Sequence, residues 1–294
     1  MTVTTVAVPV VSQPPVSARS IPPPRPTGQV WSTTCLSRYE ARQLLTEAKE
    51  HGNRNAGFGP KGIGLLLDWL DDQPGRTWQD RWLASGAETG DRAWRHIPTG
   101  WLTERGHAAK WAHEAFFSTL FTAIAVDLIR PSLPWLVRAS FQRGHLMRIL
   151  AGCRDPEGFS RLRALCSADA DISTAAATRT TYRTGLILAA KGGAIADITV
   201  GDIVELLEAE AEHCGTKPGA THLFYRILHA LCCFGPGAPA TLRQLRAVGQ
   251  RSPDELIDRF QILCRPVRDL LVDYLRERQP ALDYASLVSL AGFL

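Results

Sequence analysis

Residues 181–203 read TYRTGLILAAKGGAIADITVGDI, and this stretch decides the fold class. Apolar residues follow helical spacing up to the pair Gly192-Gly193, where the pattern breaks, and a second helical pattern begins soon afterwards. Thr199 and Asp202 are suited to bind the free N–H groups at the start of that second helix, which we expect over residues 200–213. The stretch therefore predicts two helices joined by a short, capped link.

The same alternation of helical patterns with Gly or Pro separators extends along most of the sequence. No stretch combines sustained two-residue alternation with hairpin turns, so we expect no β-sheet. The sequence predicts an all-α fold, a multi-helix bundle. Its helices are expected near residues 37–50, 104–129, 136–151, 156–166, 173–191, 200–213, 219–234, 241–248, 253–262, 265–278 and 283–294.

Composition divides the chain into four parts. Residues 1–34 carry seven prolines among Val, Ser and Thr, and such a segment cannot form a core, so we predict a disordered Pro-rich arm. Seven of the eight tryptophans lie between Trp69 and Trp135, and aromatic rings at helical spacing usually form a core, which predicts a Trp-rich helical domain over 35–134. A second helical domain over 135–240 and a C-terminal helical segment over 241–294 complete the predicted organisation.

The overall composition is that of a globular protein, with 45% hydrophobic and 21% charged residues. The seven cysteines show no spacing typical of a disulfide framework, which favours a reducing compartment. The longest apolar stretch, residues 115–126, is too short to span a bilayer, and the first residues lack the features of a signal peptide. We therefore expect a cytoplasmic protein without a membrane segment.

Positive charge is concentrated in one part of the chain. The net charge is only +4, but 28 of the 33 basic residues are arginines, which suit phosphate binding; a GC-rich genome would give the same excess. Residues 136–191 carry nine basic and four acidic side chains, whereas residues 192–240 carry two and six. Such a basic segment attracts phosphates, and its alternative explanation is a solvated helical face. The candidate DNA-binding residues are Arg161, Arg163, Arg179, Arg183, Lys191 and Arg226.

Residues 57–62 (GFGPKG) match the spelling of a dinucleotide-binding fingerprint. That motif requires a preceding strand and a surrounding βαβ unit, and the sequence predicts neither. We therefore interpret the stretch as a linker and expect no cofactor.

A cluster of potential metal ligands occupies residues 213–233. On a helix over 219–234, His222 and His229 would lie two turns apart, and Cys214 could complete a zinc site. No Cys-x-x-Cys pair accompanies these residues, and free cysteines commonly act as small hydrophobes. Zinc binding is therefore an alternative, and the prediction is that no metal is bound.

Residues 241–261 have the spelling of a helix-turn-helix, with a turn at Gly249 and several arginines nearby. Any helical hairpin in an all-α protein gives this pattern, so it remains an alternative location for DNA recognition.

Two sets of residues resemble the tyrosine recombinase (phage-type integrase) superfamily. The first is Thr181-Tyr182-Arg183 followed by Ile195-Ala196-Asp197-Ile198-Thr199-Val200-Gly201-Asp202-Ile203, which is similar to the Ile-x-x-Ile-Thr-x-x-Asp-Ile link of the family's core-binding domain. The second combines the Trp-rich stretch 69–86 with Arg265-Pro266-Val267-Arg268-Asp269 and resembles the amino-terminal region of large integrases carried on bacterial mobile elements. The resemblance covers roughly residues 36–294.

The resemblance implies a DNA-binding protein that takes part in DNA integration and site-specific recombination. It implies a core-binding-like (SAM-like) domain over 135–240 and double-stranded DNA as the partner. It also leaves self-association on the DNA open. A rival interpretation from another class is a helical scaffold or regulatory protein that binds other proteins.

The family's catalytic groups are arginines, a lysine, histidine-class residues and a tyrosine nucleophile, and they lie in a separate C-terminal domain. The local match, His145-Leu146-Met147-Arg148, stands before the Ile-Thr link instead of well after it, and no tyrosine follows at the family's distance. No catalytic residue can be transferred, so we expect no strand-transfer chemistry. Helical spacing continues over residues 284–294, where the sequence stops, which predicts a truncated integrase.

Overall fold

The computed structural model describes residues 23–28, 30–52, 59–89, 93–139, 143–214, 221–235, 238, 241–242 and 252–294. In this part of the chain every regular element is a helix, which confirms the predicted all-α fold. The described residues form two compact units, one ending at Leu242 and the other covering 252–294.

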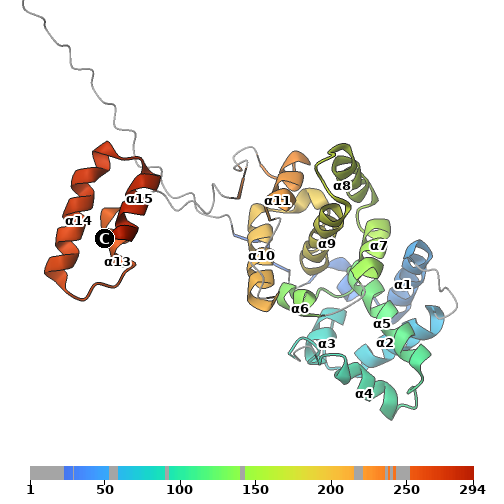
Figure 1. Cartoon of the computed structure of the whole chain (residues 1–294). Coiled ribbons are helices and arrows are strands. Elements are labelled where there is room, and N and C mark those ends of the chain that lie inside the picture. The colour runs from blue at the N-terminus through green and yellow to red at the C-terminus, as the bar shows by residue number, and fades with distance from the viewer. Residues whose placement is uncertain are drawn as a thin grey trace, which may run out of the picture. The chain divides into compact units, whose positions relative to one another are not determined.

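The larger unit is a bundle of packed helices (Figure 1). Its elements are η1 (Ser32–Cys35), α1 (Arg38–Gly52), α2 (Gly59–Asp71), α3 (Trp78–Ala84), α4 (His96–Glu104), α5 (Lys110–Ala125), α6 (Leu133–Arg138), α7 (Arg143–Cys153), α8 (Pro156–Ala168), α9 (Thr174–Lys191), η3 (Ile195–Asp197), α10 (Val200–Cys214) and α11 (Thr221–Ala230).

Several predicted helices begin or end elsewhere than expected, and for two of them the local cause is clear. The helix expected over 104–129 starts only at Lys110, because Gly106 adopts a left-handed backbone with φ 78° and terminates α4. The helix expected over 136–151 is two helices. Ser132 caps α6 by accepting a hydrogen bond from the Trp135 N–H, and α6 ends at Arg138 because Ala139 has extended backbone.

The tryptophans form a connected core, as their helical spacing predicts. Trp69, Trp82, Trp94 and Trp135 are fully buried. Edge-to-face contacts link Trp69 to Trp82 (ring centroids 6.2 Å apart), Trp82 to Trp135 (5.1 Å) and Trp135 to Trp94 (4.9 Å). Trp111, by contrast, is 36% exposed at the start of α5, where Lys61 lies over its ring.

The structure shows no division between residues 134 and 135. Trp135 lies on α6, in the second predicted domain, yet its ring completes the aromatic core of the first. Helix α7 likewise packs against α1 and α5. The predicted domains 35–134 and 135–240 are therefore one compact unit, because side chains distant in sequence share a core. The boundary predicted near residue 241 does coincide with a division between units.

The GFGPKG stretch has a structural explanation in its described residues, 59–62. Gly59 and Gly62 lie in the first turn of α2, which packs against α5. A Cβ atom at Gly62 would stand 2.5 Å from the Ala115 carbonyl oxygen and 2.6 Å from Thr119 Oγ1. Only a glycine permits this close approach of two helices. No strand precedes α2 in the described residues, so the features of a dinucleotide site are not found there.

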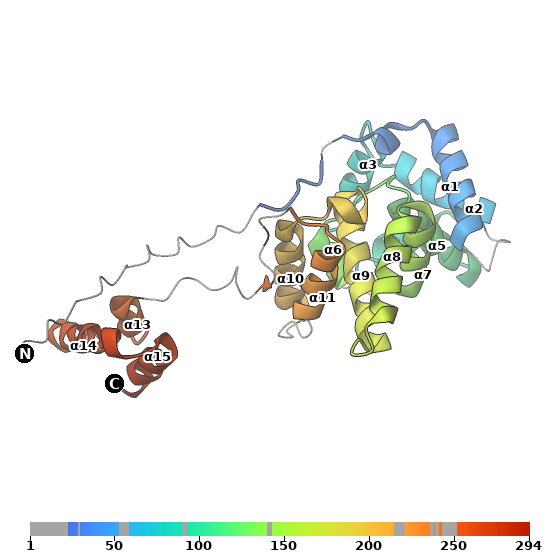
Figure 2. The same ribbon diagram turned by 90° about the horizontal axis from the view of Figure 1, so that it is seen from above.

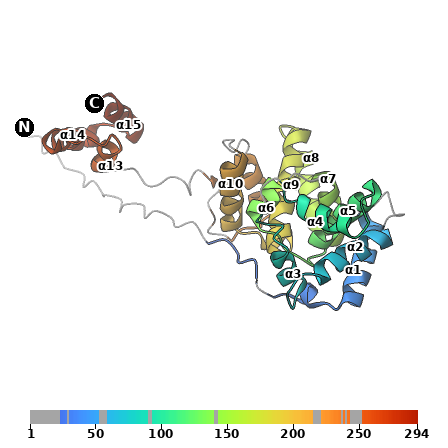
Figure 3. The ribbon, with the colours of Figure 1, turned by 90° about the horizontal axis from the view of Figure 1, so that it is seen from below.

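The structure describes only the last part of the predicted Pro-rich arm, residues 1–34, because residues 1–22 and 29 lie outside the described residues. Residues 23–28 and 30–34 pack on the helices, with η1 beside α3 (Figure 3). The Trp31 Nε1–H donates to the Asp127 carbonyl oxygen (2.5 Å), and the Arg130 guanidinium lies over the Trp31 ring at 4.0 Å. Proline content does not prevent such ordering, because the segment uses partners on distant helices.

The smaller unit contains α13 (Pro253–Asp258), α14 (Arg265–Arg278), η4 (Gln279–Ala281) and α15 (Tyr284–Phe293). The prediction for α14 is confirmed to the residue, whereas the helix expected over 253–262 ends at Asp258. The core of this unit consists of Leu256, Ile257, Val272, Leu275, Leu287 and Ala291.

Candidate nucleic-acid interface

Helices α8, α9 and α11 pack against one another and carry four of the predicted DNA-binding arginines (Figure 2). Their first turns explain why they form. Asp155 caps α8 through the Gly158 N–H (2.9 Å), with Pro156 in the first helical position. Ser173 caps α9 through the Ala176 N–H (3.3 Å). The arginines on this helix trio are Arg161 and Arg163 of α8, Arg179 of α9 and Arg226 of α11.

Two of these arginines lie where α8 and α11 meet. Arg161 Nη2–H donates to the Leu231 carbonyl just after α11 (3.4 Å), and Arg226 forms an ion pair with Asp169 just after α8 (3.1 Å). The two contacts show that α8 and α11 run antiparallel. The Arg226 side chain is 61% exposed, and an ion pair so exposed contributes little to stability. Arg226 can therefore exchange Asp169 for an external anion at low cost.

The other two arginines are unpaired among the described residues. Arg163 and Arg179 are both exposed and have no ion pair or hydrogen bond with any described side chain or carbonyl. Arg148 on α7 is exposed in the same way; it lies in the same basic segment but is not among the candidate DNA-binding residues. All four arginines of the helix trio are exposed, and Arg163 and Arg179 differ from Arg161 and Arg226 in having no partner among the described residues.

Two predicted DNA-binding residues are placed where phosphate contact is obstructed. Arg183 is only 4% exposed and makes a two-pronged ion pair with Glu210, at 2.7 Å from Nη2 and 3.1 Å from Nε. Lys191 pairs with Glu205 at 2.8 Å, and its side chain is 7% exposed. The cause is that α9 is the central helix, in contact with α6, α7, α8, α10 and α11, so its second half is buried on all sides. We therefore remove both residues from the candidate interface.

Helix capping explains the residue types found in the link between α9 and α10. Thr199 Oγ1 accepts a hydrogen bond from the Asp202 N–H (3.2 Å), and the Asp202 carboxylate accepts one from the Thr199 N–H (3.0 Å). This reciprocal pair confirms the capping that the sequence predicts. Asp202 is also fully buried and accepts two hydrogen bonds from Arg25, from its backbone N–H (2.7 Å) and from Nε (2.5 Å). Sequence reasoning missed Arg25, because nothing near it indicates a partner 177 positions away.

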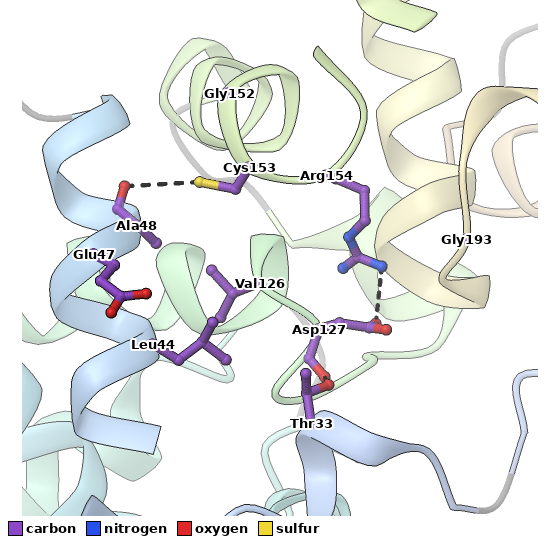
Figure 4. A pocket seen from close by; sticks show the side chains of 10 residues that line it. All are labelled: Thr33, Leu44, Glu47, Ala48, Val126, Asp127, Gly152, Cys153, Arg154 and Gly193. Carbon is purple, nitrogen blue, oxygen red and sulfur yellow. Dashed lines mark hydrogen bonds and ion pairs between the residues drawn. The ribbon is translucent and has the colours of Figure 1, made fainter. Parts of the chain in front are cut away.

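A surface cavity of about 540 Å³ opens between α1 and the ends of α5 and α7 (Figure 4). At its floor Asp127, with a left-handed φ of 70°, pairs with Arg130 (2.7 Å) and Arg154 (3.0 Å). Arg154 also donates to the last carbonyls of α5, at Ile124 and Ala125. These polar groups pair with one another and connect the end of α5, the segment at Arg130 and the end of α7. Their function is therefore structural.

The remaining polar groups of this cavity do not form a reactive pair. Burial raises the pKa of the Cys153 thiol, which donates to the Ala48 carbonyl oxygen at 3.8 Å. A raised pKa disfavours the thiolate, the form that acts as a nucleophile. Glu47, the other carboxylate in the lining, is exposed. The cavity therefore offers no arrangement typical of catalysis.

The structure bears on two alternatives from the sequence, the zinc site and the helix-turn-helix. Within the described residues, no group of three or more His, Cys, Asp or Glu side chains could hold a metal ion. His229 lies instead against Tyr225 and Phe234 in an aromatic cluster, and the Cys214 side chain lies outside the described residues. The helix-turn-helix pattern falls largely on residues 243–251, which also lie outside them. The same holds for the His145 side chain.

No protein-family model, curated protein or solved structure matches this chain. The likeness to tyrosine recombinases thus remains a prediction from the residues. None of the helices described here has the combined length and apolar character needed to cross a bilayer.

Proposed function

We propose that this chain binds double-stranded DNA as the N-terminal and core-binding part of a site-specific integrase, in DNA integration and recombination. The observation that supports the proposal best is the group of exposed arginines on α8, α9 and α11, of which Arg163 and Arg179 have no partner among the described residues. Guanidinium groups in solvent are the usual contacts to DNA phosphates. The proposal assigns no strand-transfer chemistry to this chain, and it implies a cytoplasmic location.

The charge distribution on the helix trio suits backbone binding more than reading of bases. Arg161 and Arg226 already use one N–H group each to join α8 and α11, and their remaining donors face solvent. Arginines spread over three packed helices match phosphates along a duplex, whereas base reading requires one element in a groove. We therefore propose a phosphate-contacting surface.

The test measures the salt dependence of duplex binding. Fluorescence anisotropy of a labelled mixed-sequence duplex, titrated with the full chain at several salt concentrations, gives the slope of log affinity against log salt. Each phosphate contact contributes about one unit to that slope. The double variant Arg163→Ala/Arg179→Ala should lower the slope by about two units and weaken binding at every salt concentration.

A matched control removes the same charge elsewhere. Arg42 on α1 and Arg76 before α3 are also exposed, and neither forms an ion pair among the described residues. The Arg42→Ala/Arg76→Ala variant should keep the wild-type slope. If both variants lose the same amount of affinity and salt slope, the effect reflects net charge alone, and the proposed interface is wrong. Absence of duplex binding by the unmodified chain at low salt would reject the DNA proposal altogether.

The rival proposal, a helical protein that binds other proteins, is favoured by one observation. Several large apolar side chains of the smaller unit are exposed on α14 and just before it.

A further inference from the structure

Helix α14 carries apolar side chains on two sides. One side supplies Val272 and Leu275 to the core of the smaller unit. The other side, together with Leu263 just before the helix, forms the α14 stripe, which we define as Leu263, Val267, Leu270 and Tyr274. Leu263 is 98% exposed, Leu270 69% and Val267 46%, and Tyr274 is half-buried.

The α14 stripe has the spacing of a helix pairing surface. On the helix itself Val267, Leu270 and Tyr274 are separated by three and four residues, which is the repeat that keeps apolar side chains on the seam between two coiled helices, and Leu263 lies just before the first helical residue, Arg265. The core of the unit packs on the side of α14 that carries Val272 and Leu275, and the described residues of the unit leave Val267 and Leu270 exposed on the other side. Exposed apolar patches of this kind mark association surfaces.

We propose that the α14 stripe binds the same stripe of a second copy of this chain, with the two helices parallel. The charged residues beside the stripe indicate a second copy of the chain as the partner. Asp273 lies on one side of it and Arg278 on the other, where the Arg278 guanidinium is over the Tyr274 ring at 5.3 Å. In a parallel pair a residue before a seam position faces the residue five positions further on in the other helix. Asp273 of each copy therefore meets Arg278 of the other.

The antiparallel arrangement lacks this complementarity. With two α14 stripes centred on Leu270, Asp273 would face Val267 of the other copy, and Arg278 would face Ile262. Asp273 also pairs with Arg276 of its own helix (3.2 Å). A parallel pair adds the Asp273–Arg278 contact twice by symmetry, whereas the antiparallel pair leaves both Arg278 side chains without a carboxylate. The proposal does not rest on DNA binding, since the α14 stripe does not belong to the helix trio α8, α9 and α11.

Sedimentation of the full chain over a range of concentrations, without DNA, tests the proposal. The unmodified chain should show a mass that rises with concentration towards that of a dimer. Leu270→Glu places a charge in the seam and should weaken association about tenfold or more. Leu83→Glu is the matched control, because Leu83 is 54% exposed on α3, in the other unit, and its substitution should leave association unchanged.

Charge exchange tests the parallel direction. Asp273→Arg alone sets two arginines against each other and should weaken the dimer, whereas Asp273→Arg combined with Arg278→Asp should restore it. A chain that stays monomeric at all concentrations, or a Leu270→Glu variant that associates like the unmodified chain, would overturn the proposal. Equal association of the single and double charge variants would overturn the parallel arrangement. Because DNA is absent throughout, failure here leaves the DNA proposal untouched.

Discussion

Replacing Gly62 by alanine tests the close approach of α2 and α5. The new Cβ would stand 2.5 Å from the Ala115 carbonyl oxygen, which belongs to the α5 backbone and cannot rotate away. It would also stand 2.6 Å from Thr119 Oγ1, the group that accepts a hydrogen bond from Lys49 at 2.8 Å. Overpacking of this kind costs about 1–3 kcal/mol, against a gain of about 1 kcal/mol in helix propensity. We expect a net loss of up to about 2 kcal/mol.

The same substitution two residues further along α2 is the control. A Cβ at Gly64 would have only Arg42 Nη2 nearby, at 3.8 Å, so Gly64→Ala should stabilise the unit by about 0.5–1 kcal/mol. Urea unfolding followed by tryptophan fluorescence compares the two variants, because the tryptophans lie in this unit. If Gly62→Ala unfolds at the same urea concentration as Gly64→Ala or at a higher one, the packing argument is wrong.

Two further variants address buried charge, both by urea unfolding. Asp127→Asn keeps a residue that tolerates φ 70° but leaves Arg130 and Arg154, whose side chains are 11% and 10% exposed, without a carboxylate. It should cost about 3–5 kcal/mol, whereas Asp68→Asn in an exposed pair should cost less than about 1 kcal/mol; equal losses would contradict the argument. Burial lowers the pKa of Lys49 to about 8, so the unfolded chain holds this proton above pH 8 while the folded chain releases it. Stability should rise between pH 8 and 10 by about 2 kcal/mol more in the unmodified chain than in Lys49→Met, and parallel pH profiles would refute this.

Elements that depend on neighbouring residues were predictable from the sequence. The bounds of α14 and the capping of α10 by Thr199 and Asp202 follow from local spacing and hydrogen-bonding groups, and both are found in the structure. The end of α4 just before Gly106 is also a local signal, because glycine readily adopts the left-handed backbone that ends a helix.

Features that depend on distant residues were not predictable. Arg183 and Arg179 stand one turn apart on the same helix, and no pattern in their neighbours tells that one is buried against Glu210 and the other exposed. The burial follows from where α10 and α11 pack on α9, which is a property of the whole unit. The candidate interface therefore retains four of its six predicted residues.

The contact between Arg25 and Asp202 affects how this protein can be shortened. A version beginning at Ser37 would keep every α-helix described in the larger unit, yet it would leave the fully buried Asp202 carboxylate without its guanidinium partner. Removing one member of a buried pair commonly costs about 3–5 kcal/mol, a large fraction of the stability of a unit this size. The shortest piece that folds on its own should therefore start before Pro24, well ahead of the first helical residue.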